Sequence, residues 1–113
     1  MITEEGYARL NQEAKADYGK AKLSLVPTEI IRAIADVREY GNQKYKSPDN
    51  WKQVDKQRFI DALYRHWLAY IDGEKVDKES GIEHIKHVAC NLAFIIEMDK
   101  QKEPICKDGV CYI

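Results

Sequence analysis

Three polar residues at helical spacing, His84, His87 and Asn91, are the part of this sequence best suited to chemistry. At 3.6 residues per turn they form one column on a helix predicted within residues 81–98. Phe94 and Met98 continue this column, which indicates that it is not a solvated face. It lies beside an apolar stripe of Ile85, Val88, Ala89, Leu92 and Ile96.

Buried imidazoles and amides need hydrogen-bond partners, because an unpaired polar group away from water costs free energy. The column therefore predicts a polar pocket. A neutral imidazole there could bind a metal ion, and a protonated one could hold phosphate oxygens. The alternative is a buried polar network that only fixes the packing of the helix.

Arg65 and His66 form a second group, in the middle of another predicted helix. His66 shares an arc of that helix with Ala62 and Ala69, whose small side chains leave room for a ligand or a close helix contact. Arg65 lies one turn from Asp61, so an internal ion pair is one interpretation. The other is that its planar guanidinium binds a phosphate.

Carboxylates form the third group. Asp36 and Glu39 are three residues apart and could converge on one hard cation. The alternative is that these side chains are solvated, since acidic residues are common on exposed helix faces. The candidates for metal ligand or general base are Asp36, Glu39, Asp61, Glu74, Asp77 and Glu79.

A polar segment with Lys44, Tyr45, Asn50 and Trp51 is the fourth group. Trp51 follows Pro-Asp-Asn, and its ring could dock on the core and anchor the loop. It could instead stack on a nucleobase while Asn50 reads the edge of that base.

Strong helix signals and weak strand signals predict an all-α fold. The first core helix begins near Thr28, as N-cap, and Ile30 and Ile34 mark its buried face. Gly41 is a predicted break, although the helix could continue to Tyr45.

A second core helix is predicted over residues 55–71, with Gly73 as its C-terminal stop. Ser80 and Glu83 match a capping box at the start of the third, which should fade near Lys100. Short links between short helices predict a compact antiparallel bundle. A bundle of this size buries little surface, so we expect a homo-oligomer.

The chain divides into an N-terminal helical arm (residues 1–21, with a helix over 4–17), a helical domain (22–100) and a C-terminal tail (101–113). Asp108-Gly109 is a turn signal, so the tail is either a small hairpin or an ordered arm. Cys106 and Cys111 are five apart, a spacing that argues against a zinc site in the tail.

The 113 residues carry a net charge of −1, which argues against nucleic acid as a partner. No apolar run approaches the roughly 20 residues that span a bilayer, so no membrane partner is expected. An acidic start without an apolar region and an odd cysteine count favour the cytoplasm. Walker, GxGxxG, HExxH and nucleophile-elbow motifs are absent.

An ordered set of short stretches resembles a known family. They are Leu25-Val26-Pro27, Arg38-Glu39-Tyr40-Gly41 with Lys44-Tyr45, Asn50-Trp51, Arg65-His66 with Ala69-Tyr70, Gly73-Glu74, Asp77-x-Glu79-Ser80-Gly81, and His84-x-x-His87-x-x-x-Asn91 with Phe94. Together they resemble the phage-associated N-terminal domain of dATP/dGTP diphosphohydrolases, which is similar to the all-α, MazG-like nucleotide pyrophosphohydrolases. The resemblance covers residues 22–98.

This resemblance implies a helical bundle that assembles as an oligomer. It also implies an enzyme that uses Mg²⁺ or Mn²⁺ to cleave a deoxynucleoside triphosphate to the monophosphate and pyrophosphate. In such chemistry the metals bridge phosphate oxygens and activate a water molecule. If the chain is phage-encoded, the cytoplasm is that of the host.

Roles follow for individual residues under this interpretation. The candidate catalytic residues are Glu39, Asp61 and His87. The candidate substrate-binding residues are Lys44, Tyr45, Asn50, Trp51, Arg65, His66, Tyr70, His84 and Asn91. The candidate metal ligands are Glu39, Glu74, Asp77 and Glu79.

Two other functions are open to the sequence. MazG-like proteins carry an E-E-x-x-E run on one helix and an E-x-x-D motif on the next. Here Glu39 stands without that run, and no E-x-x-D occurs in the predicted third core helix. The weak carboxylate signature and the basic and imidazole groups favour a non-catalytic protein that sequesters a nucleotide, such as a signalling nucleotide of a host defence. A helical protein that binds only other proteins is the third interpretation.

Overall fold

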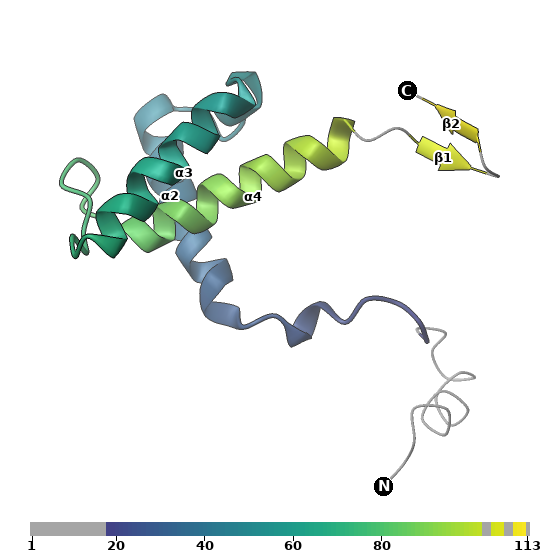
Figure 1. The fold of residues 1–113 in the computed structure, drawn as a ribbon, viewed down its shortest axis with the longest axis horizontal. Coiled ribbons are helices and arrows are strands. Elements are labelled where there is room, and N and C mark those ends of the chain that lie inside the picture. Colours follow the sequence, from purple (N-terminus) through teal and green to yellow (C-terminus); the bar gives the residue numbers. More distant parts are fainter. Residues whose placement is uncertain (1–17, 103–104, 108–109, 113) are drawn as a thin grey trace, which may run out of the picture.

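The computed structural model describes residues 18–102, 105–107 and 110–112. Within them the fold is all-α apart from one small hairpin, as predicted, and helix α4 packs against both α2 and α3 (Figure 1). The helix predicted over residues 4–17 lies outside the described residues. Within them, no helix combines the length and apolarity that crossing a membrane requires.

Helix α2 spans Thr28–Tyr45 and follows a short 3-10 turn at Leu23–Leu25. Pro27 has extended backbone angles and takes the N-cap position, so the prediction of Thr28 as N-cap is wrong by one residue. The predicted break at Gly41 is wrong and the alternative, continuation to Tyr45, is confirmed, because a single glycine only weakens a helix by about 0.5–1 kcal/mol. Lys46 is the C-cap of the helix, and its φ of 55° is left-handed.

Helix α3 spans Lys56–Ile71 and follows a second 3-10 turn at Asn50–Gln53. Its end is stopped by Gly73, as predicted, because φ there is 98° and a side chain would be strained. The amide of Glu74 donates to the carbonyl of Ala69 (2.9 Å) and that of Gly73 to Tyr70 (3.1 Å). These two bonds form a Schellman motif and satisfy the last carbonyls of the helix.

Helix α4 spans His84–Lys102, and the segment before it is folded on itself. Val76 and Glu83 form an isolated antiparallel bridge, and the amide of Asp77 donates to the carbonyl of Ile82 (2.9 Å). The predicted capping box is wrong, because α4 begins only at His84. The Ser80 hydroxyl instead forms hydrogen bonds with Asp77, Ile82 and His87.

Helix α4 buries polar side chains together with Cys90 and Met98. His84, His87 and Asn91 are only 5%, 7% and 9% exposed, so the predicted burial of the polar column is confirmed. In the apolar stripe beside it, Ile85, Leu92 (46%) and Ile96 (60%) are exposed, while Val88 and Ala89 are half-buried. The polar column therefore faces α2 and α3, while part of the apolar stripe faces outward in the single chain.

The tail forms a hairpin of two antiparallel strands, which decides between the two predicted forms. Strand β1 (Ile105–Lys107) pairs with β2 (Val110–Tyr112), and Cys106 is opposite Cys111 in the register. The predicted turn at Asp108-Gly109 lies outside the described residues.

Candidate functional site

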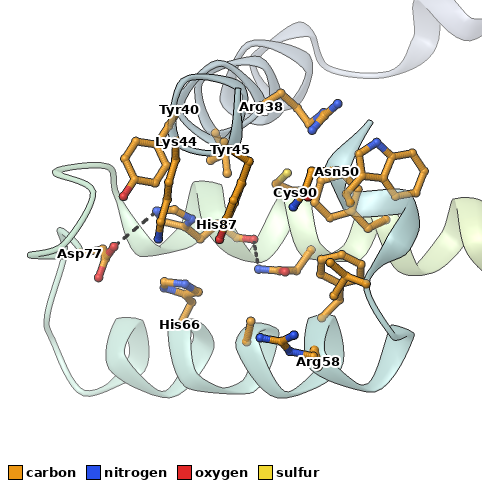
Figure 2. Close-up of a pocket in the computed structure, with 18 of the residues that line it drawn as sticks. Arg38, Tyr40, Lys44, Tyr45, Asn50, Arg58, His66, Asp77, His87 and Cys90 are labelled. Atoms are coloured by element: carbon orange, nitrogen blue, oxygen red, sulfur yellow. Dashed lines mark hydrogen bonds and ion pairs between the residues drawn. The ribbon is translucent and has the colours of Figure 1, made fainter. Parts of the chain in front are cut away.

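A cavity of about 400 Å³ lies between α2, α3, α4 and the loops that connect them (Figure 2). Many residues singled out from the sequence line it: Lys44, Tyr45, Asn50, Trp51, Arg65, His66, Asp77, Glu79, His87 and Asn91. Figure 2 shows Asp77, His66 and His87 at one end of the cavity and Asn50 and Arg58 at the other. Three helices and two loops therefore bring these side chains together.

At the end of the cavity that contains His66, a hydrogen-bond network joins Asp77, Ser80 and His87. The Ser80 hydroxyl donates to Oδ2 of Asp77 (2.8 Å), and Oγ of Ser80 lies 2.7 Å from Nε2 of His87. Since the hydroxyl has only one proton, Nε2 of His87 must be the donor to Ser80. The network therefore fixes the ring and the tautomer of His87.

The local environment sets the charges in this network. Burial lowers the pKa of His87 below its usual range, in opposition to the nearby Asp77 carboxylate. Burial alone would raise the pKa of Asp77, but two hydrogen bonds from Ser80 outweigh it and lower that pKa. A neutral imidazole and an ionised carboxylate are therefore held side by side, with Nε2 of His87 3.7 Å from Oδ2 of Asp77.

His66 connects this network to His84. Its ring stacks on that of His87, with centroids 4.3 Å apart and an angle of 9° between the planes. Nδ1 of His66 lies 2.8 Å from Nδ1 of His84, so one of these nitrogens donates to the other. Burial and the neighbouring His87 lower the pKa of His66 to about 4, which keeps its ring neutral at pH 7. His84 itself does not line the cavity.

Cationic side chains surround the rest of the cavity. Arg38, Lys44, Arg58 and Arg65 all line it. The Arg38 guanidinium donates to the carbonyl of Pro48 (2.5 Å), which holds the loop after α2. Nζ of Lys44 lies 2.8 Å from Glu79, and this hydrogen bond raises the pKa of Lys44.

Of the two interpretations of Arg65, the ion pair with Asp61 is not found among the described residues. The Asp61 carboxylate accepts instead from the Gln57 amide (3.0 Å). Phosphate binding by Arg65 stays a prediction.

Aromatic rings form the opposite end of the cavity. Trp51 stacks on Phe94 with centroids 4.8 Å apart and an angle of 16°, and Phe59 lies 4.8 Å from the same ring. The Arg38 guanidinium is 5.3 Å from the centroid of Phe94. Trp51 therefore docks on α4 and also lines the cavity, while its stacking on a base and the contact of Asn50 with that base remain predictions.

Several predicted residues lie away from the cavity. Glu39 is exposed on α2. Asp36 does not share a cation with Glu39, because its Oδ2 pairs with Nζ of Lys86 at 2.9 Å. Tyr70 stacks on Trp67, with centroids 5.6 Å apart. Those absent from the lining are Asp36, Glu39, Asp61, Tyr70, Glu74 and His84.

The cavity is also lined by residues to which the sequence assigned no role, among them Arg38, Arg58 and Cys90. Arg58 lies one helical turn before Ala62 and two before His66, so the arc chosen for His66 could have found it. Cys90 is 1% exposed, and burial raises the pKa of its thiol to about 11.

Comparisons with known proteins show the family of the chain. A dATP/dGTP diphosphohydrolase of Salmonella phage PMBT28 is 38% identical over 81 residues, which are 72% of this chain and 28% of that protein. The chain therefore spans less than a third of the length of this relative. No solved structure matches the chain. The family model described as "dATP/dGTP diphosphohydrolase, N-terminal" matches residues 10–107, and the chain belongs to this family.

Proposed function

We propose that this chain is the nucleotide-handling part of an enzyme that hydrolyses a deoxynucleoside triphosphate to the monophosphate and pyrophosphate. The name of the phage relative supports a purine deoxynucleotide, dATP or dGTP, as the substrate. The cavity of about 400 Å³ falls within the range of small-molecule sites, which is about 300–1,000 Å³.

The observation that carries this proposal is the combination of groups that line one cavity. The rings of Trp51 and Phe94 lie at one end with Asn50, Arg38 and Arg58, and Lys44, Asp77 and His87 lie at the other. A nucleotide carries the matching groups, an aromatic base and a multiply charged phosphate chain. Arginine is suited to that chain because its planar fork binds two phosphate oxygens at once.

The reaction would use a divalent cation, Mg²⁺ or Mn²⁺. Asp77 and Glu79 are the carboxylates in the described lining, and two carboxylates suit a cation that also takes phosphate oxygens as ligands. Glu79 already pairs with Lys44, so a triphosphate would compete with Glu79 for that ammonium. The metal would polarise the phosphate and lower the pKa of a bound water.

His87 is the proposed general base. A base must be unprotonated at the working pH, and the lowered pKa of His87 meets this requirement. Ser80 and Asp77 orient the ring through Nε2, which leaves Nδ1 as the nitrogen that can accept a proton.

The proposed unit is a homo-oligomer. On α4, Leu92 and Ile96 are exposed in one row, and on α3 Trp67 (41%), Leu68 (51%) and Ile71 (55%) are exposed as well. Exposed apolar patches of this kind mark interfaces between proteins. A second copy of the chain is the proposed partner, because it offers a patch of the same kind.

A product assay tests the activity. Purified protein is incubated with each deoxynucleoside triphosphate and with cyclic nucleotides, in Mn²⁺, in Mg²⁺ or with chelator. Products are resolved by ion-exchange chromatography before and after heating. Monophosphate and pyrophosphate formed only with metal would support the proposal, whereas a nucleotide that is bound and returned intact on heating would contradict it.

A further inference from the structure

We infer that His66, His84 and Asp77 form a binding site for a transition-metal ion such as Zn²⁺, Co²⁺ or Mn²⁺. One nitrogen from each histidine and one carboxylate oxygen of Asp77 lie within 4.8 Å of one another. They come from α3, from the first residue of α4 and from the folded segment between these helices. The inference deepens the proposed function, because it names the class of metal beside the cavity.

The two imidazole nitrogens have nearly the separation that one ion requires. Nδ1 of His66 and Nδ1 of His84 are 2.8 Å apart. Two nitrogens that bind one tetrahedral Zn²⁺, each at about 2.0–2.1 Å, are about 3.3 Å apart. His66 is only half-buried, so a small rotation of its side chain would increase the distance between the two Nδ1 atoms. Both Nδ1 lone pairs would then point at the ion.

A second observation comes from the other nitrogen of His84. Nε2 is buried and has no hydrogen-bond partner among the described residues, and Oε2 of Glu74 lies 3.6 Å from it. A metal on Nδ1 places the ring proton on Nε2, where it faces this carboxylate. Pairs of histidine and carboxylate with this orientation are the usual support of metal sites. Glu74 is therefore a positioning residue rather than a ligand.

Asp77 and His66 are also held by neighbours that are not ligands. Ser80 donates two hydrogen bonds to Oδ2 of Asp77 (3.1 and 2.8 Å), and His87 stacks on His66. Such support fixes ligands before the ion binds. Three protein ligands leave an open coordination position, as in catalytic metal sites, and both His66 and Asp77 line the cavity.

The ligand types set the preference among metals. Imidazole nitrogen suits Zn²⁺, Co²⁺ and Ni²⁺ and binds Mn²⁺ more weakly, whereas Mg²⁺ prefers oxygen ligands. The site should therefore bind Zn²⁺ and Co²⁺ far more tightly than Mg²⁺. Asp77 would then bind this ion and would be shared with the phosphate-bound cation of the proposed reaction.

Direct metal titration tests the inference in the absence of nucleotide. The full chain, freed of metal with chelator, is titrated with Zn²⁺ against a chromophoric chelator and with Co²⁺ by visible absorption. We expect one ion per chain and no displacement by millimolar Mg²⁺. The C106S/C111S variant should give the same result, because cysteine is not part of the site.

Variants locate the ion. H66Q and D77N should each weaken Zn²⁺ binding at least about tenfold, and E74Q should weaken it less. D61N is the matched control, since Asp61 is an exposed α3 carboxylate that accepts from Gln57 and is not one of the three ligands, and it should retain the ion. Circular dichroism checks that each variant folds. His84 is buried and its replacement would risk unfolding the protein, so the test relies on H66Q and D77N.

Two results would overturn the inference: no bound ion in the C106S/C111S variant, or unchanged Zn²⁺ affinity in both H66Q and D77N. Because these measurements need no nucleotide, they are separate from the test of the proposed function. A chain that binds Zn²⁺ but cleaves no nucleotide would keep the site and reject the reaction. A chain that cleaves nucleotide with Mg²⁺ but binds no Zn²⁺ would do the reverse.

Discussion

At the scale of single residues, the Ser80 hydroxyl is the most heavily used polar group of the site. It donates to Asp77, accepts from Nε2 of His87 and accepts from the amide of Ile82 (3.2 Å). A hydroxyl has one proton and two lone pairs, so all of its capacity is used. The position of His87 therefore depends on a residue that need not touch the substrate.

We expect S80A to lower kcat about 10–100-fold and to leave KM for the nucleotide nearly unchanged. The variant leaves a buried nitrogen of His87 without its partner and frees the ring to turn, at about 1–3 kcal/mol of stability. Steady-state kinetics with dATP or dGTP measures the first effect, and urea denaturation measures the second. S24A is the matched control, because Ser24 is exposed in the turn before α2. Equal kinetics in both variants would exclude a positioning role for Ser80.

Cys90 should be inert in the folded protein. Its pKa of about 11, against a usual 9.0, means a thiolate fraction at pH 8 that is about a hundredfold smaller. Because the folded pKa is the higher one, the protonated thiol stabilises the fold below pH 9, and this contribution is lost as the pH rises through 11. Alkylation by iodoacetamide at pH 8, followed by peptide mass spectrometry, should modify Cys90 only in urea. Rapid modification of native Cys90 would contradict its burial.

At the scale of the elements, two glycines should respond in opposite ways to the same change. G73A forces a side chain into the left-handed backbone that ends α3, at about 1–2 kcal/mol, and should destabilise the protein. G41A lies inside α2, where an added Cβ meets no atom within 4 Å, and should stabilise it by about 0.5–1 kcal/mol. Urea denaturation of both variants measures the difference. A stabilised G73A would show that α3 does not end in the Schellman motif.

Helix α3 should bind the phosphates through one face. Arg58 and Arg65 line the cavity from this helix. Replacing either arginine with a neutral residue removes a charge-assisted hydrogen bond to phosphate, which contributes about 1.5–3 kcal/mol. R58Q and R65Q should therefore each weaken nucleotide binding about 10–100-fold, measured by calorimetry with a triphosphate. R32Q is the matched control, since Arg32 is exposed on α2 and pairs with Glu29. If R32Q weakens binding as much as R58Q, the cations act only through overall charge.

How far the sequence predicts these elements depends on how local each signal is. Gly73 stops α3 as predicted, because its effect is confined to its own backbone angles. The capping box of Ser80 and Glu83 failed because the Ser80 hydroxyl finds Asp77 and His87, which is a contact between segments that no local pattern contains. Helix bounds were thus predicted to within a few residues. The exception is the start of α4, where the expected capping hydroxyl of Ser80 is engaged by tertiary contacts instead.

The candidate site shows the same division. The spacing of His84, His87 and Asn91 predicted a buried polar column, because position on one helix follows from periodicity. Spacing could not show which carboxylates reach that column, since this depends on how helices and loops pack. Asp36 meets Lys86 instead of a shared cation, while Asp77 reaches the cavity from a loop.

At the scale of the whole molecule, the described chain has a small apolar core. Cys90 and Met98 are the buried hydrophobic residues among those described, while α4 turns its polar column inward. An inward polar face serves a ligand site but contributes little hydrophobic stabilisation. Leu92 and Ile96 form an outward apolar row on the same helix, and another copy of the chain is the partner that we propose covers it.

We expect the purified chain to be an oligomer, and L92E and I96E to shift it to monomer. Each variant places a carboxylate in an apolar interface, where an unpaired charge costs several kcal/mol. Light scattering coupled to size-exclusion chromatography gives the mass of each species directly. E97K is the matched control, because Glu97 is an exposed α4 residue and its change is also one of charge. Wild-type protein that elutes as a stable, folded monomer would contradict the proposed assembly, and the outward apolar row would then need another partner.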